Sequence, residues 1–164
     1  MAKSSVTRNA GLVMETSPRE KILPQRLCLV IGGGSLAPGW GIGRAISVAY
    51  ARAGASVAVA DVNLAAAAET VELVRAEGGT AEAFQVDVLN DDSIVALVRS
   101  ACERMGPIDV LHNNVGLSKP GNARDTSGAD WRRVQDANVT SLHVAAQAVL
   151  PSMMERRRGV SLDA

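Results

Sequence analysis

Short, continuously apolar segments alternate along this sequence with longer segments whose apolar residues recur at helical spacing. The predicted strands span residues 27–31, 56–60, 81–86 and 108–112, and the predicted helices span 42–53, 64–77, 91–105 and 129–158. Strands that are apolar on both faces need helices on both sides of their sheet. The order therefore predicts an α/β fold, a three-layer, doubly wound parallel sheet with a ligand crevice at the carboxyl ends of the strands. Pro151 interrupts the last helical pattern and is expected to bend or break that helix.

Composition and charge narrow the function classes. Lys plus Arg and Asp plus Glu both number 17, a formal net charge of zero, which disfavours a nucleic-acid or anionic-membrane partner. No apolar run approaches the ~20 residues of a membrane span. Residues 1–24 show no period and are expected to form a flexible tail without a secretory signal, so a cytoplasmic location follows by elimination. Cys28 and Cys102 lie in apolar-periodic segments and are expected to be buried thiols rather than a metal site.

The first predicted strand-to-helix junction is rich in glycine. Glycine allows a sharp turn and the close approach of a phosphate, while the unpaired N–H groups of the following helix face an anion. Placed between a strand and a helix, this segment predicts a dinucleotide-binding, Rossmann-like domain over residues 25–164. The alternative is a loop that only needs positive φ angles. The candidate cofactor-binding residues of this segment are Gly32, Gly34, Ser35, Gly41, Ile42 and Gly43.

Asp61 ends the second predicted strand. A carboxylate there can accept hydrogen bonds from both hydroxyls of an adenosine ribose, and it repels a 2′-phosphate. No Arg or Lys follows directly, so the sequence favours NAD over NADP. The alternative is that Asp61 caps the helix that begins near Leu64.

Polar residues also follow the third and fourth predicted strands. Asp87 and Val88 are candidates for binding adenine, with a loop or helix-capping carboxylate as an equally open alternative. Asn114, beside Asn113, is expected to tie adjacent strands together, and Gly116 to leave space for the cofactor. A plain polar turn is the alternative for this last segment.

Four features together resemble the short-chain dehydrogenase/reductase family. They are the turn ending in Gly41-Ile42-Gly43, Asp61, the segment 86–88, and the segment 108–116 with its Asn-Asn-Val-Gly sequence. The resemblance implies NAD(P)-dependent hydride transfer between nicotinamide and a small-molecule alcohol or carbonyl, a strand order 3-2-1-4, and a homo-oligomer for a full-length parent enzyme. It also implies that Asn138 holds a water in the proton relay. From the residues alone, Asn138 is an ordinary polar helix position or a kink.

The sequence departs from the family pattern in three places. Ile31 stands where Thr is usual, and eight residues separate Gly32 from Gly41, which lengthens the loop over the pyrophosphate. Val115 replaces the commoner Ala, and His112 before it is expected to be a satisfied core histidine. The family's catalytic Ser and Tyr-x-x-x-Lys form the third departure.

No residue of this sequence matches that catalytic set. Tyr50 is the only Tyr, and Gly54 stands four residues after it in place of Lys. The sequence ends where a fifth strand is expected to begin, which predicts a C-terminally truncated domain with strand 108–112 as its edge. Without the general acid, the chain is expected to be inactive alone. A non-catalytic nucleotide-binding or interaction module and an unstable fragment are the open alternatives.

Overall fold

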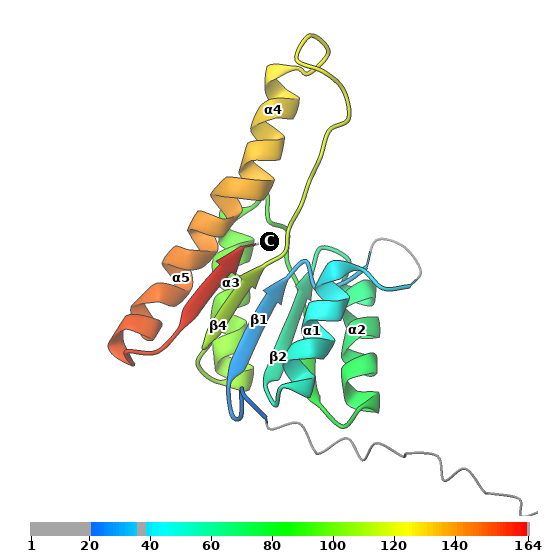
Figure 1. The fold of residues 1–164 in the computed structure, drawn as a ribbon. Coiled ribbons are helices and arrows are strands. Elements are labelled where there is room, and N and C mark those ends of the chain that lie inside the picture. Colours follow the sequence, from blue (N-terminus) through cyan, green and yellow to red (C-terminus); the bar gives the residue numbers. More distant parts are fainter. Residues whose placement is uncertain (1–20, 36–38, 164) are drawn as a thin grey trace, which may run out of the picture.

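A five-stranded parallel sheet forms the middle layer of the structure, a computed structural model that describes residues 21–35 and 39–163 (Figure 1). The strand order is β3-β2-β1-β4-β5. The strand bounds are β1 Leu27–Ile31, β2 Ser56–Asp61, β3 Thr80–Gln85, β4 Val110–Asn113 and β5 Val160–Asp163. The predicted α/β fold with a doubly wound parallel sheet is confirmed. Most of the predicted tail, residues 1–20, lies outside the described residues.

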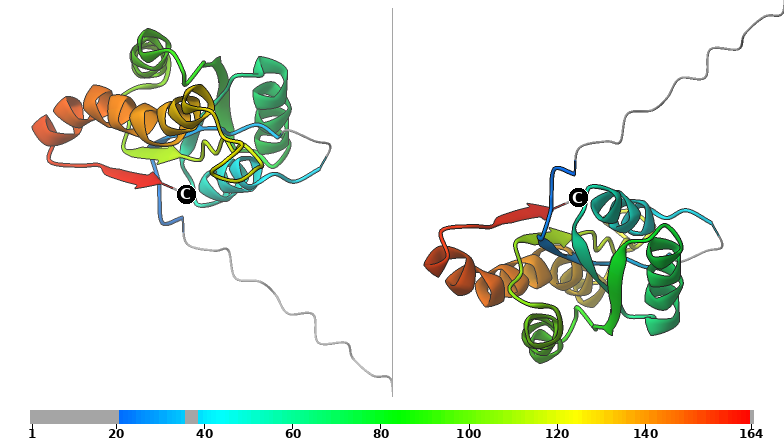
Figure 2. Two further views of the ribbon diagram at one scale, coloured as in Figure 1. Left: turned by 90° about the horizontal axis from the view of Figure 1, so that it is seen from above. Right: turned by 90° about the horizontal axis from the view of Figure 1, so that it is seen from below.

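Helices cover both faces of this sheet, α1 and α2 on one side and α3 and α5 on the other (Figure 1, Figure 2). The alternation of side chains along β1 explains the two layers. Leu29 belongs to an apolar cluster with residues of α3 and α5, whereas its neighbour Val30 belongs to a cluster with residues of α1 and α2. The bounds are α1 Ile42–Arg52, α2 Leu64–Ala76, α3 Asp91–Met105, α4 Gly128–Gln135, the π-helical turn η1 Asp136–Thr140, and α5 Ser141–Glu155.

Strand β5 extends the expected strand order 3-2-1-4, which the sheet retains, and corrects the expectation that β4 forms the edge. The order 3-2-1-4 left β4 at the edge, whereas β5 pairs with β4 from Val110 opposite Val160 to Asn113 opposite Asp163. All four residues of β5 are exposed. A strand this short and exposed has no apolar run, so its sequence gives little sign that it pairs with the sheet.

The buried carboxylate of Asp109 explains why β5 forms. Asp109 is 4% exposed, and it accepts hydrogen bonds from Arg156 Nη1 at 2.8 Å and Arg158 Nε at 2.7 Å. Burial alone raises the pKa of Asp109, but hydrogen bonds from Arg156, the Leu27 N–H and Arg158 outweigh it and lower the pKa. These two arginines flank the turn between α5 and β5, so the ion pairs direct the chain back to the sheet beside β4.

Pro151 does not break the last helix, so of the two outcomes expected at this proline, a bend or a break, the break is wrong. Helix α5 runs through Pro151, and the irregular segment lies instead at η1. The buried side chains Ala145, Val149 and Met153 continue the apolar face on both sides of the proline. Packing of this face against the core outweighs the loss of one backbone donor at Pro151.

The two cysteines differ in burial. Cys28 in β1 is completely buried, and burial, together with the nearby Asp109 carboxylate, raises the pKa of its thiol to about 12. Cys102 on α3 is only partly buried. Because the thiolate is the nucleophilic form, the raised pKa and the burial of Cys28 oppose a nucleophilic role near neutral pH.

His112 is only half satisfied, in contrast to the expectation of a fully satisfied core histidine. Its Nδ1 lies 2.7 Å from the Tyr50 hydroxyl of α1, and its Nε2 is buried without a hydrogen-bond partner in the described part of the chain. Burial lowers the pKa of His112, and the Asp163 carboxylate offsets part of that effect. The folded chain therefore disfavours the imidazolium.

We expect His112 to weaken the fold as the pH falls. Its pKa in the folded chain lies below the unfolded value of about 6.5, so the unfolded chain binds more protons near and below that pH, and stability is lost as the pH decreases. Urea unfolding at pH 7.5, 6.5 and 5.5 measures this loss. His112→Gln should flatten the dependence by up to one proton per molecule relative to the wild-type chain. Equal slopes for His112→Gln and the wild-type chain would refute the assignment.

Candidate functional site

A cavity of about 710 Å³ opens at the carboxyl ends of the strands. It is lined by the turn after β1, the ends of β2, β3 and β4, and one side of α4 and η1. The structure brings every candidate cofactor residue into this one cavity. They are Gly32, Gly34, Ser35, Gly41, Ile42, Gly43, Asp61, Asp87, Val88, Asn114 and Gly116.

Helix α1 begins directly against the end of β1. A Cβ on Gly43 would lie 1.8 Å from the Gly32 carbonyl oxygen, so only glycine allows this approach. Gly32 itself has a φ of +78°, in the region that favours glycine. Gly41 caps α1 without a side-chain hydrogen bond. Gly41, Ile42 and Gly43 line the cavity, so the first N–H groups of α1, which have no intrahelical acceptor, lie at its wall and can bind an anion.

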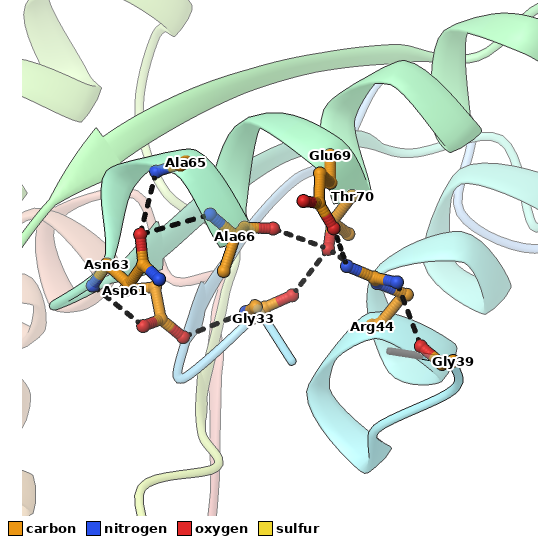
Figure 3. A network of polar contacts seen from close by, with 10 residues as sticks. Gly33, Gly39, Arg44, Asp61, Asn63, Ala65, Ala66, Glu69 and Thr70 are labelled. Carbon is orange, nitrogen blue, oxygen red and sulfur yellow. Dashed lines mark hydrogen bonds and ion pairs between the residues drawn. The ribbon is translucent and has the colours of Figure 1, made fainter. Parts of the chain in front are cut away.

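The Asp61 carboxylate lies beside this turn and joins it to β2 (Figure 3). Its Oδ2 accepts a hydrogen bond from the Gly34 N–H at 2.9 Å, and its Oδ1 accepts one from the Asn63 N–H at 3.0 Å. The capping residue of α2 is Asn63, whose side chain accepts from Ala65 N and Ala66 N. The alternative that Asp61 caps α2 is therefore wrong. Two acceptor positions on the carboxylate remain for a ligand.

Asp87 serves as a turn carboxylate and also lines the cavity. Its Oδ1 accepts a hydrogen bond from the Leu89 N–H at 3.0 Å, and its own N–H donates to Ser93 Oγ. Asn90 is the cap of α3. Asp87 therefore has the turn role that was the alternative considered from the sequence. The next residue, Val88, also lines the cavity.

Asn114 ties β4 to the turn after β1, as expected. Its Nδ2 donates to the Gly32 carbonyl at 3.0 Å, the same oxygen that approaches Gly43. No described atom lies within 4 Å of a Cβ placed on Gly116, so the cavity is open there. Asn113 is buried and donates instead to Asp163 of β5.

Comparison with known proteins decides the family. The sequence profile described as short chain dehydrogenase matches residues 27–161. The chain belongs to the short-chain dehydrogenase family. Relatives include 7alpha-hydroxysteroid dehydrogenase of Escherichia coli K12, 37% identical over 82% of this chain and 51% of the relative. Another is 2-(S)-hydroxypropyl-CoM dehydrogenase 3 of Xanthobacter autotrophicus, 34% identical over 86% of this chain and 53% of the relative.

Solved structures agree with this family. A 7alpha-hydroxysteroid dehydrogenase complexed with NADH and 7-oxo glycochenodeoxycholic acid matches with a TM-score of 0.80 and 35% identity, over 86% of this chain and 53% of that one. The chain spans about half the length of the curated relatives that it matches.

Asn138 lies in η1 and holds the connection that follows β4. Its Oδ1 accepts a hydrogen bond from the Leu117 N–H at 2.8 Å, and its Nδ2 donates to the Leu117 carbonyl at 2.9 Å. The side chain is not part of the cavity wall. Its position in a π-helical turn agrees with the kink considered from the sequence, and both polar atoms of its amide bind backbone.

Asn138→Ala is expected to lower the free energy of unfolding by about 1–3 kcal/mol, because two hydrogen bonds to a partly buried backbone are lost. Urea unfolding measures the change. Asn138→Asp keeps the acceptor for the Leu117 N–H, but it places a carboxylate oxygen against the Leu117 carbonyl oxygen, so it should also destabilise the fold. A fully stable Asn138→Ala chain would show that the two hydrogen bonds do not matter for folding.

Among the wall residues that were not sequence candidates, one is a large aromatic side chain and one is a cation. Trp40, 64% exposed, lies within the glycine-rich segment and lines the cavity, as does Arg133 of α4. Arg133 is the only cationic residue among the described residues of the wall. Arg133 lies far in the sequence from the strand ends, so no local sequence pattern identified it as a cavity residue.

Residues 21–35 and 39–163 contain neither a metal-binding cluster nor a membrane-spanning helix. No three His, Cys, Asp or Glu side chains come together in an arrangement that can hold a metal ion. None of the helices in this part of the chain is long and apolar enough to cross a membrane.

Proposed function

We propose that this chain is the NAD-binding part of an oxidoreductase that interconverts a small-molecule alcohol and carbonyl. The position of Asp61 supports this proposal most directly. Its carboxylate lines the cavity and is held by the Gly34 N–H, with acceptor positions left for two ribose hydroxyls. A 2′-phosphate would meet the same negative charge, which favours NAD over NADP.

The other candidate residues fit the remaining parts of a dinucleotide. The N–H groups of α1, with Gly32, Gly34, Ser35, Gly41 and Gly43 around them, suit the pyrophosphate. Asp87 and Val88 lie where an adenine would follow the ribose bound at Asp61, and the open space at Gly116 suits the far half of the cofactor. When bound, the nicotinamide would supply the hydride acceptor or donor.

The chain by itself is proposed to lack turnover. Its only Tyr, Tyr50, is hydrogen-bonded to His112 and does not line the cavity. Burial, with a smaller contribution from Cys28, raises the pKa of Tyr50, which opposes a role as a proton donor and acceptor near neutral pH. Asn138 then serves the site by holding Leu117, and a role for it in a proton relay needs groups beyond those in this sequence.

Exposed apolar side chains along α4, η1 and α5 support a second candidate function. Trp131, Val139, Leu150 and Met154 are 60%, 58%, 43% and 72% exposed. Such a surface suits a protein partner or a homo-oligomer. A non-catalytic nucleotide-binding module that acts through this surface is therefore the alternative. A cytoplasmic location, a small-molecule substrate and a dinucleotide-binding domain over residues 25–164 stay predictions.

Titration of the purified chain with NADH tests the proposal, with nucleotide fluorescence and the thermal transition followed together. Saturable binding with a raised melting temperature is expected, since a ligand of the folded state stabilises it. A cooperative transition without saturable binding would refute the proposed cofactor site. Cofactor-dependent oxidation of an alcohol by the pure chain would refute the lack of turnover. The absence of any cooperative transition would identify an unstable fragment.

A further inference from the structure

Arg44 is a cation placed where a helix does not favour one. It lies in the first turn of α1, next to the positive end of the helix dipole, where a carboxylate is the stabilising choice. It is also only 7% exposed, and burying a cation costs free energy unless its donors are paired. Neither helix stability nor core packing explains Arg44.

The hydrogen bonds of Arg44 all lead to the glycine-rich turn or to α2 (Figure 3). Its Nη1 donates to the Gly39 carbonyl at 2.8 Å, its Nη2 to Glu69 Oε2 at 2.8 Å, and its Nε to Thr70 Oγ1 at 3.3 Å. Thr70 is completely buried, and its hydroxyl donates to the Gly33 carbonyl at 3.0 Å. One guanidinium thus links α2 directly to Gly39 and, through Thr70, to Gly33.

These contacts hold the two described ends of the turn. We define the phosphate turn as residues 32–35 and 39–41. Its first part is fixed by Thr70 on Gly33 and by Asp61 on Gly34. Its second part leads into the capping residue Gly41 of α1, and Arg44 binds it at the Gly39 carbonyl. The position of the α1 N–H groups relative to the cavity depends on that second part.

Arg44 does not contact the cavity itself. It is absent from the cavity wall, whereas Trp40 and Gly41 on the segment that it holds are part of the wall. Each of its three nitrogens already donates to a protein acceptor. An effect of Arg44 on a ligand would therefore pass through the backbone of the phosphate turn, directly at Gly39 and through Thr70 at Gly33.

We propose that Arg44 is a positioning residue that fixes the phosphate turn on α2, so that the turn can bind the pyrophosphate of the cofactor. The inference rests on the proposed NAD-binding function. The proposal has different consequences for two parts of the ligand. The adenosine would bind at Asp61 and the Asp87 segment, which Arg44 does not contact. The pyrophosphate would bind at the phosphate turn, which Arg44 holds.

The test compares NADH with adenosine as ligands of Arg44→Lys and Arg44→Ala. A lysine keeps the charge but cannot reproduce the fork of three directed hydrogen bonds. We expect the Kd for NADH to rise about tenfold or more, the effect of losing a charge-assisted hydrogen bond, and the Kd for adenosine to change less than about twofold. Fluorescence titration suits NADH, and NMR titration suits the weaker adenosine. If Arg44→Ala does not fold, the Arg44→Lys result decides.

Arg52→Ala is the matched control. Arg52 lies at the other end of α1 and joins the same two helices through a bidentate pair with Glu77, at 2.6 and 2.7 Å. It should leave both Kd values unchanged. An unchanged Kd for NADH in Arg44→Lys, or equal weakening of NADH and adenosine, would overturn the inference. A wild-type chain that binds neither ligand would instead refute the proposed function.

Discussion

Asp61→Ala is expected to reduce the preference of the chain for NADH over NADPH by about 10- to 100-fold, the effect of a charge-assisted hydrogen bond lost and a repulsion removed. Fluorescence titration with both nucleotides measures the ratio of their Kd values. The ratio matters more than either Kd, because Asp61 also accepts a hydrogen bond from the Gly34 N–H, and its removal weakens the site for both.

Asp61→Asn is the control for that second effect. The amide keeps an acceptor for the Gly34 N–H and removes the negative charge, although its Nδ2 cannot accept the second hydrogen bond, from the Asn63 N–H. It should therefore lower the preference for NADH with less damage to overall binding. If Asp61→Ala leaves the ratio of the two Kd values unchanged, Asp61 does not determine the choice of cofactor.

Gly43→Ala is expected to abolish NADH binding and to destabilise the fold by about 3 kcal/mol or more, beyond ordinary overpacking. The added Cβ would lie 1.8 Å from the Gly32 carbonyl oxygen and 2.8 Å from Asn114 Nδ2. Both neighbours are fixed, one by backbone and the other by its hydrogen bond, so α1 has to move away from β1. Thermal unfolding and NADH titration measure the two effects.

Gly128→Ala provides the comparison. A Cβ at Gly128, in the first turn of α4, meets only the Arg132 side chain at 3.6 Å or more, so the expected change in stability is within about 0.5 kcal/mol. A Gly43→Ala chain that unfolds at the same temperature as Gly128→Ala would contradict the close packing of α1 on β1.

The sequence predicted those features that depend on neighbouring residues. The apolar segment 27–31 is β1 with unchanged bounds, since a strand buried on both faces needs an unbroken apolar run. Asp61 and Asn114 were expected at strand ends, and parallel strands bring their carboxyl ends to one edge. The cavity therefore gathers residues that were predicted one by one. The other strand bounds moved by one or two residues, where hydrogen bonding rather than hydropathy sets the end.

The features that the sequence did not predict depend on residues far apart in the chain. β5 needs Asp109, 47 residues before Arg156. The side-chain amide of Asn138 is hydrogen-bonded to the backbone of Leu117, 21 residues away. In the sequence Arg44 looks like an ordinary helix residue. Its role becomes visible only in the structure, where it is hydrogen-bonded to Glu69 and Thr70 of α2. No local period encodes such pairings, because each partner alone is compatible with many positions.

The alternation of Leu29 and Val30 on β1 divides the interior into two compartments separated by backbone. A void opened beneath α3 and α5 cannot be filled by a larger side chain beneath α1 and α2, because the sheet lies between them. Substitutions in the two compartments share no contact, so their energetic costs should add. Compensating mutations for this chain are therefore to be sought within one compartment, among residues on the same side of the sheet.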